Sequence, residues 1–226
     1  MGNLNLKIFI FFLLLLSIIG FLTSCVSHNV VHQLNPHSNP NNKKLYTSVA
    51  MVTSTPGSKG KATTLASAWA IDENHLITAG HFCDTVTDLW KLEKAGPKIN
   101  VIVSDAQGTN ISIGEATIIA FSTYPDVCIL HYPLHPLLPL EVETNYSIIE
   151  TEDPITIVGA PDGYFPIRKD GYIWQVEKKL YLSIQAQSGN SGCPVIRDGK
   201  VIGMVIAVII SLHESGIAER GDTVLN

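Results

Sequence analysis

The chain has 226 residues, with 15 Lys or Arg against 20 Asp or Glu, so its formal net charge is −5. This acidic balance, without a basic run interleaved with aromatic residues, argues against a nucleic-acid-binding surface. Apolar residues make up 46% of the chain, which excludes wholesale disorder and leaves enough material for a packed core.

The N-terminus has the pattern of an export signal. Lys7 precedes an apolar run from Ile8 to Leu22, and the run ends in Leu22-Thr23-Ser24-Cys25, which resembles the bacterial lipobox. The resemblance implies a lipoprotein signal over residues 1–24 and a lipid on the sulfur of Cys25. We therefore expect a domain outside the cytoplasm, anchored by lipid to a membrane of the bacterial envelope. An uncleaved transmembrane anchor and a plain secretory signal are the alternatives.

A flexible tether is expected over residues 25–45. The segment is rich in Asn, His, Pro and Ser and has no periodic apolar positions. Its histidines, His28, His32 and His37, are irregularly spaced, with no Cys or carboxylate among them. We interpret them as spacer, and we expect neither a metal site nor another cofactor in the chain.

The body, residues 46–226, has the spacing of an all-β domain. Short β-branched and apolar runs alternate with Gly, Pro and Asp, without the helices that would separate parallel strands. The runs are Tyr46–Thr53, Ser67–Ile71, Asn100–Ser104, Ile111–Phe121, Ile155–Gly159, Gly171–Gln187, Pro194–Ile196 and Lys200–Ile210. One helix is predicted over Thr85–Lys94, as a surface excursion that Gly96-Pro97 ends.

A glycine-flanked serine stands near the end of the chain, in Gly189-Asn190-Ser191-Gly192. Glycines permit a sharp turn, so the N–H groups of Gly189 and Ser191 can point at one spot where an oxyanion would form. Taken alone, the segment fits a hairpin turn with a solvated serine equally well.

Two segments further towards the N-terminus change that balance. Leu76–His81 is an apolar strand that ends in small residues and a histidine, and Asp126 opens the apolar run Asp126–Leu130. A carboxylate that enters buried structure needs donors, and an imidazole N–H is one. The order His81, Asp126, Ser191 along the chain is that of the chymotrypsin template.

Together these segments resemble the three signature blocks of trypsin-like serine peptidases, most of all the HtrA/Deg branch. Gly159-Ala160-Pro161 and Lys200–Met204 also stand where that branch has similar segments. The resemblance implies two packed six-stranded antiparallel β-barrels with little helix. It also implies serine endopeptidase activity on proteins or peptides, without a cofactor.

The resemblance assigns roles to individual residues. Ser191 is the nucleophile, His81 the general base and then acid, and Asp126 fixes the imidazole tautomer. Gly189 and Ser191 supply the oxyanion donors. The primary pocket falls on five residues, none of them acidic: Gln185, Ala186, Val205, Ile206 and Ala207. We therefore expect cleavage after small or medium aliphatic or uncharged polar residues, and rejection of Arg and Lys.

The chain departs from the family pattern at three points. Cys193 replaces a glycine usual two residues after the nucleophile, which adds a side chain to a closely packed region and an oxidisable thiol. Asn190 stands where digestive relatives carry an aspartate, so we expect no activation by a newly cut N-terminus. No PDZ domain is expected after the barrels, which argues against regulation by PDZ-controlled cages.

The pairing of the cysteines and one alternative function stay open, whereas we do not expect a zinc site. If Cys25 carries lipid, Cys83, Cys128 and Cys193 remain, which allows one disulfide or three buried thiols. A zinc site on His75, His81 and Cys83 matches no common ligand spacing. The alternative function is a catalytically inactive lipoprotein that keeps the double barrel as a peptide-binding or scaffold module.

Overall fold

The computed structural model describes residues 40–54, 64–93, 98–134, 137–209 and 215–224. The chain divides into two units, Met1–Asn35 and Pro36–Asn226, and every described element belongs to the second. The predicted signal, Cys25 and the histidines of the tether lie outside the described residues. No helix of the described part has the length and apolarity needed to cross a membrane.

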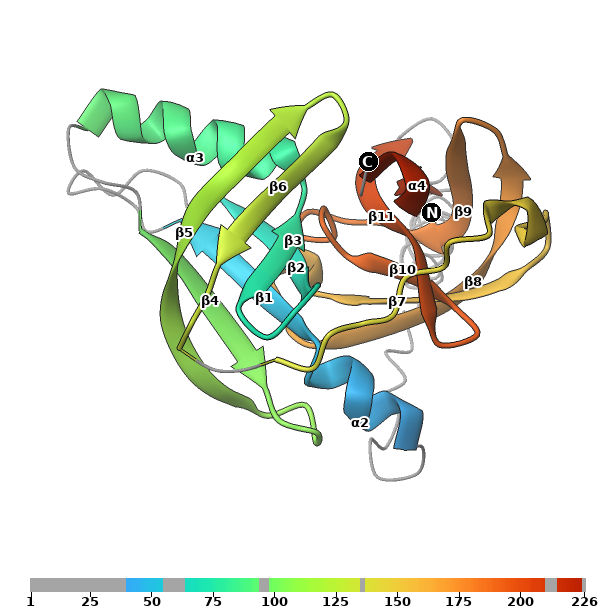
Figure 1. The fold of residues 1–226 in the computed structure, drawn as a ribbon, viewed down its shortest axis with the longest axis horizontal. Helices are drawn as coiled ribbons and strands as arrows, with labels where there is room; N and C mark the ends of the chain where they lie inside the picture. Colours follow the sequence, from blue (N-terminus) through green and yellow to red (C-terminus); the bar gives the residue numbers. More distant parts are fainter. Residues whose placement is uncertain (1–39, 55–63, 94–97, 135–136, 210–214, 225–226) are drawn as a thin grey trace, which may run out of the picture. The chain divides into compact units, whose positions relative to one another are not determined.

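The first barrel closes from six antiparallel strands in the spatial order β1-β2-β3-β6-β5-β4 (Figure 1). Period-2 burial explains why these residues form strands: in β4, Ile99, Val101 and Val103 are buried while the residues between them are half-buried. The strands are β1 (Val49–Ser54), β2 (Leu65–Ala70), β3 (His75–Thr78), β4 (Ile99–Ser104), β5 (Asn110–Thr123) and β6 (Asp126–His131).

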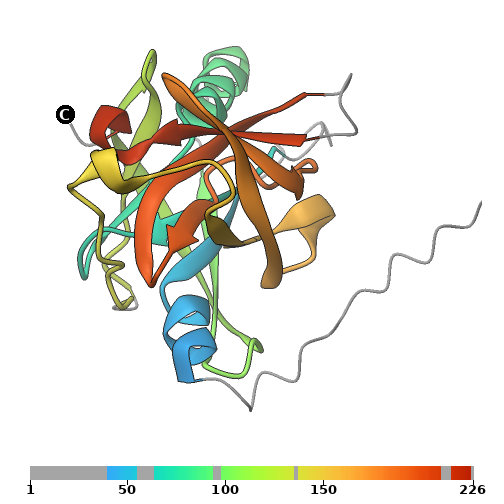
Figure 2. The same cartoon turned by 90° about the vertical axis from the view of Figure 1, so that its right-hand side faces the viewer.

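The second barrel repeats this architecture in the order β10-β11-β12-β9-β8-β7. Its strands are β7 (Pro154–Gly159), β8 (Ile167–Val176), β9 (Lys179–Gln185), β10 (Pro194–Arg197), β11 (Lys200–Ile209) and β12 (Ser215–Arg220). Figure 2 views this barrel, drawn from amber to red, in front of the first. The predicted fold of two six-stranded antiparallel barrels is confirmed.

A shared apolar cluster packs between the barrels. Trp69 and Ile77 of the first barrel join Val158, Ile196 and Met204 of the second, and all five are buried. The unbroken apolar run of β11 follows from this position, because one side of the strand faces its own barrel core and the other faces this cluster.

Helices are few among the described residues, and all but α3 (Gly80–Glu93) are short. The others are α2 (Pro40–Tyr46), α4 (Gly221–Val224) and two 3₁₀ turns, η2 (Tyr146–Ile148) and η3 (Pro161–Gly163). Helix α2 differs from the prediction, because residues 40–45 were expected to belong to the tether and Tyr46 to begin a strand. Leu45 and Tyr46 are buried in the cluster between the barrels, which gives this helix its packing.

Helix α3 lies against β5 and β6 and begins five residues earlier than predicted (Figure 1). It was expected to be a surface excursion, but Phe82, Cys83 and Val86 are buried in the core of the first barrel. The prediction failed because Thr78–His81 was assigned to the end of a strand. The strand ends at Thr78, and His81 belongs to the first turn of the helix.

Candidate active site

His81 and Asp126 are brought together where helix α3 meets the β5–β6 hairpin. The first residue of α3 is a glycine, Gly80, because any side chain there would collide with the hairpin. A Cβ atom would lie 1.8 Å from the carbonyl oxygen of Ser122. This close approach sets the first turn of α3 beside Asp126, the first residue of β6.

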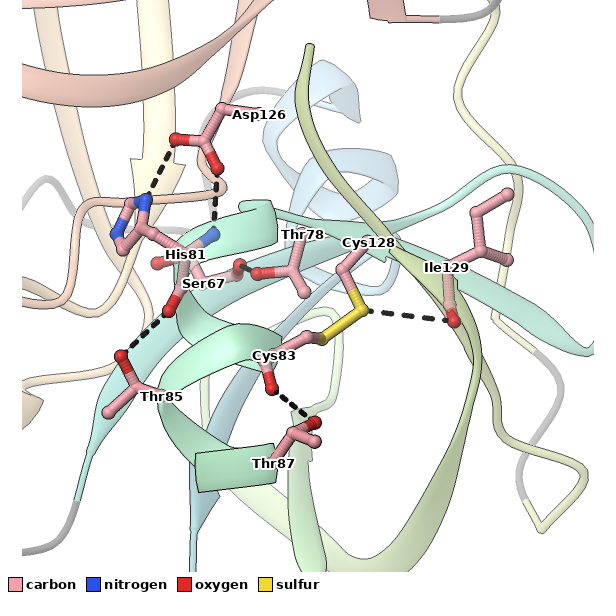
Figure 3. The surroundings of a disulfide bond; sticks show 9 residues. All are labelled: Ser67, Thr78, His81, Cys83, Thr85, Thr87, Asp126, Cys128 and Ile129. Atoms are coloured by element: carbon pink, nitrogen blue, oxygen red, sulfur yellow. Dashed lines mark hydrogen bonds and ion pairs between the residues drawn. A yellow bond between two sulfur atoms is a disulfide. The ribbon is translucent and has the colours of Figure 1, made fainter. Parts of the chain in front are cut away.

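Both carboxylate oxygens of Asp126 accept hydrogen bonds from His81. Oδ1 accepts the backbone N–H of His81 at 2.7 Å, and Oδ2 lies 2.8 Å from Nδ1 of the ring (Figure 3). A carboxylate can only accept here, so the hydrogen of the neutral ring sits on Nδ1 and Nε2 is left as an acceptor. The backbone contact fixes the position of the His81 main chain, and the Nδ1 contact fixes the rotation of the ring.

The free ring nitrogen of His81 faces Ser191, with Nε2 3.0 Å from Oγ. The Asp126 side chain is 17% exposed and that of His81 is 46% exposed, so the ring is open to a substrate while its partner is shielded. The structure thus brings all three predicted residues into one hydrogen-bonded chain, from elements in both barrels. Such a chain can take the hydroxyl proton as the oxygen attacks a carbonyl carbon.

The turn before Ser191 presents backbone N–H groups. Gly189 has φ +89°, in the left-handed region, and a Cβ atom there would lie 2.1 Å from the carbonyl oxygen of Ala160. Within the described part of the chain, no acceptor bonds the N–H of Gly189 or of Ser191. Both predicted oxyanion donors are therefore available to a substrate oxygen.

Ser67 supports this turn, and the sequence analysis missed it. The residue is fully buried on β2, where its Oγ donates to the carbonyl of Gly189 at 2.6 Å and accepts the N–H of Ala160 at 2.9 Å. Its backbone N–H donates to the carbonyl of Ser191 at 2.7 Å. One serine of the first barrel thus holds the turn of the second barrel that carries Ser191.

A disulfide between Cys83 and Cys128 resolves the alternatives that the sequence left open (Figure 3). Cys83 stands two residues after His81 on α3, and Cys128 stands two residues after Asp126 on β6. The bond therefore joins the two elements that carry the His81–Asp126 pair. The bond also occupies the sulfur of Cys83, which is therefore not free to bind zinc.

We expect loss of this disulfide to lower stability strongly. It closes a loop of 45 residues, and the chain-entropy relation gives about 4 kcal/mol for a loop of that length. The double variant Cys83→Ala/Cys128→Ala should lose this amount of unfolding free energy, as measured by denaturant unfolding.

A reductant supplies the matched control for this disulfide prediction. It should bring the wild type to the stability of the double variant and leave the variant itself unchanged. Equal stability of the oxidised wild type and the double variant would show that the bond does not constrain the fold.

Cys193 is fully buried, so the oxidation expected of an exposed thiol does not apply. Burial raises the pKa of the thiol to about 12, against a smaller lowering by the Ser67 hydrogen bond, and so keeps it protonated. Gly159 makes room for the side chain, because a Cβ atom there would lie 2.0 Å from the sulfur. The extra side chain is accommodated by a glycine on the facing strand.

The predicted pocket residues do not all line one space. Val205 is buried in the core cluster of the second barrel with Ala186, whereas Ile206 is buried in the cluster between the barrels. These two side chains therefore pack into different apolar clusters of the structure. Gln185 and Ala207 are exposed.

Comparisons with known proteins identify the family of the chain. A family model described as a trypsin-like peptidase domain matches residues 66–204. No curated protein sequence matches the chain significantly.

Solved structures share the fold at low sequence identity. The active form of the Rv3671c protease from M. tuberculosis is 20% identical at a TM-score of 0.68, with 82% of this chain and 81% of that chain covered. Deg5 is 19% identical at a TM-score of 0.65, with 81% and 88% covered. The HtrA-type protease AlgW, solved with a tripeptide, is 21% identical at a TM-score of 0.65, with 82% and 60% covered.

The family model spans more than half of the chain and includes His81, Asp126 and Ser191. The chain therefore belongs to the family of trypsin-like peptidase domains.

Proposed function

We propose that the protein is a serine endopeptidase that hydrolyses peptide bonds of proteins through an acyl-enzyme. The observation that carries this proposal is the hydrogen-bonded chain Asp126–His81–Ser191, in which Nε2 of His81 lies 3.0 Å from Oγ of Ser191. Membership of a peptidase family and the unbonded N–H groups beside Ser191 support it.

The proposed reaction proceeds in two halves. Oγ of Ser191 attacks the substrate carbonyl carbon as its proton passes to Nε2 of His81, and the N–H groups of Gly189 and Ser191 stabilise the oxyanion. His81 then gives the proton to the leaving amine, and an ester to Ser191 remains. Water, deprotonated by His81, attacks this ester, and the proton returns to Ser191 as the acid product departs.

An active-site probe tests the proposal directly. A fluorophosphonate should label Ser191 of the purified protein, since the reaction needs an activated hydroxyl and a formed oxyanion hole. Well-folded protein that stays unlabelled would refute the proposal and favour a peptide-binding module.

We further propose that cleavage follows small or medium aliphatic or uncharged polar residues. The segment 185–189 that leads to the nucleophile contains no carboxylate of its own to pair with a substrate Arg or Lys. A peptide-library profile measures this preference. Dominant cleavage after Arg or Lys would refute the proposed preference.

We also propose that the protein is exported and held at a bacterial membrane by a lipid on Cys25. The lipobox-like sequence supports this, and so does the Cys83–Cys128 disulfide, because such bonds persist in oxidising compartments. Metabolic labelling with a fatty acid should mark the wild type but not Cys25→Ser. Unlabelled wild-type protein would refute the lipid anchor.

A further inference from the structure

Lys169 of β8 reaches the segment that leads to the nucleophile. Its ammonium group donates to the backbone carbonyl of Gln185 at 2.9 Å and to Oε1 of Gln187 at 2.7 Å. Both acceptors lie just before Gly189, which carries one of the two N–H groups proposed to stabilise the oxyanion. A half-buried cation therefore holds this segment at two points.

The amide of Gln187 continues the contact to Asp162. Its Nε2 donates to Oδ2 of Asp162 at 3.0 Å, while its Oε1 faces the ammonium of Lys169. The cation can only donate and the carboxylate can only accept, so the two charges determine which way the amide points. Lys169, Gln187 and Asp162 form a single ordered chain from β8 to the η3 turn.

Asp162 in turn holds the peptide that contains the proposed oxyanion donor. Its backbone N–H donates to the carbonyl of Ser188 at 2.7 Å. The C=O and N–H of a planar trans peptide point in opposite directions, so this bond directs the N–H of Gly189 away from Asp162. Asp162 itself has φ +51°, a left-handed conformation that Asp and Asn adopt more readily than other non-glycine residues but still less readily than the right-handed one. The side-chain bond to Gln187 helps to keep it there.

The Ser188–Gly189 peptide needs such support because Gly189 does not choose an orientation by itself. Glycine populates positive and negative φ about equally, so the observed φ of +89° is not imposed by the residue. Rotation of this peptide would turn the Ser188 carbonyl towards the place of the N–H. The site would then present a lone pair to the developing oxyanion.

We propose that Lys169 is a positioning residue that keeps the Ser188–Gly189 peptide in its donating orientation, acting through Gln187 and Asp162. The proposal rests on the proposed peptidase function. It assigns a supporting role to three residues that touch neither the substrate carbonyl nor the proton-transfer chain.

The variant Lys169→Met tests the cation, since it keeps most of the side-chain length and removes the charge. Loss of one oxyanion donor lowers kcat by about 10²–10³-fold, and we expect a loosened donor to lower it by roughly 10–100-fold. KM for a small peptide should change less than about threefold, because the oxyanion forms only in the transition state. Lys169→Arg should recover most of the loss.

The control variant is Lys200→Met. It removes a lysine of the same barrel that bonds Glu141, and it should leave kcat unchanged.

A charge exchange tests the connection through Gln187. Gln187→Glu sets two carboxylates against each other and should lower kcat, whereas adding Asp162→Asn restores a donor and an acceptor and should raise it again. Asn suits the left-handed backbone of residue 162, so the second change adds no strain. Losses that simply add in the double variant would overturn the proposal.

Hydrogen exchange separates failure of this proposal from failure of the proposed function. In Lys169→Met, the amide of Asp162 should exchange faster than in the wild type, whether or not the protein is a peptidase. Wild type unreactive towards a fluorophosphonate would refute the peptidase function while the exchange result still tests the chain of contacts. Unchanged exchange and unchanged kcat in a folded Lys169→Met variant would overturn the role of Lys169.

Discussion

Ser191→Ala should lower kcat by about 10⁶-fold and leave the fold and peptide binding intact. The change removes the only oxygen within reach of Nε2 of His81 in the described site, and losses of this size follow removal of a triad nucleophile. The backbone contacts of the turn survive, since the Ser191 carbonyl still accepts the N–H of Ser67 and Gly189 keeps its bond to Ser67 Oγ. The measurement is the steady-state hydrolysis of a peptide, with binding of the same peptide measured separately.

Non-additivity is the sharper form of this test. If Ser191 and His81 act as one unit, His81→Ala should lose nearly as much activity as Ser191→Ala. The double variant should then be no worse than either. Hydrolysis that persists in Ser191→Ala, or losses that multiply in the double variant, would mean that the two residues do not form one nucleophilic system.

The proposed triad could be predicted because each of its residues lies in a local motif. Small residues precede His81, an apolar strand follows Asp126, and glycines flank Ser191. The barrels were predictable for a similar reason, because apolar residues recur at alternate positions of strands such as β4 and β9, and these are the positions that are buried. These local patterns can be recognised without knowing which distant residues they contact in the folded structure.

The supporting residues could not be predicted because their partners are far away in the sequence. Ser67 bonds Gly189 from 122 positions earlier, and nothing near it marks a buried serine between two barrels. Lys169 stands in the polar stretch Arg168-Lys169-Asp170, which is typical of a solvated strand face. Strand β12 was missed as well, because Gly216 and the buried, charged Glu219 interrupt its apolar pattern.

Asp126→Asn should lower kcat by about 10⁴-fold while conserving the shape of the site. The carboxylate now faces two donors, the backbone N–H of His81 at 2.7 Å and the ring Nδ1 at 2.8 Å. An amide has only one oxygen to offer them. If that oxygen keeps the backbone N–H, the amide NH₂ faces Nδ1 and forces the ring hydrogen onto Nε2. The ring can then no longer accept the proton of Ser191.

The opposite orientation of the amide is no better. Its NH₂ would then face the backbone N–H of His81, and two donors left without acceptors at a shielded site cost about 1–3 kcal/mol. We therefore expect the tautomer with its hydrogen on Nε2, which the ¹⁵N chemical shifts of the His81 ring would reveal alongside the lost turnover. Asp84→Asn is the matched control. It removes the same charge from a residue three positions after His81 on helix α3, and it should change kcat by less than about twofold. A variant Asp126→Asn that kept more than about a tenth of the wild-type kcat would show that Asp126 does not set the tautomer of His81.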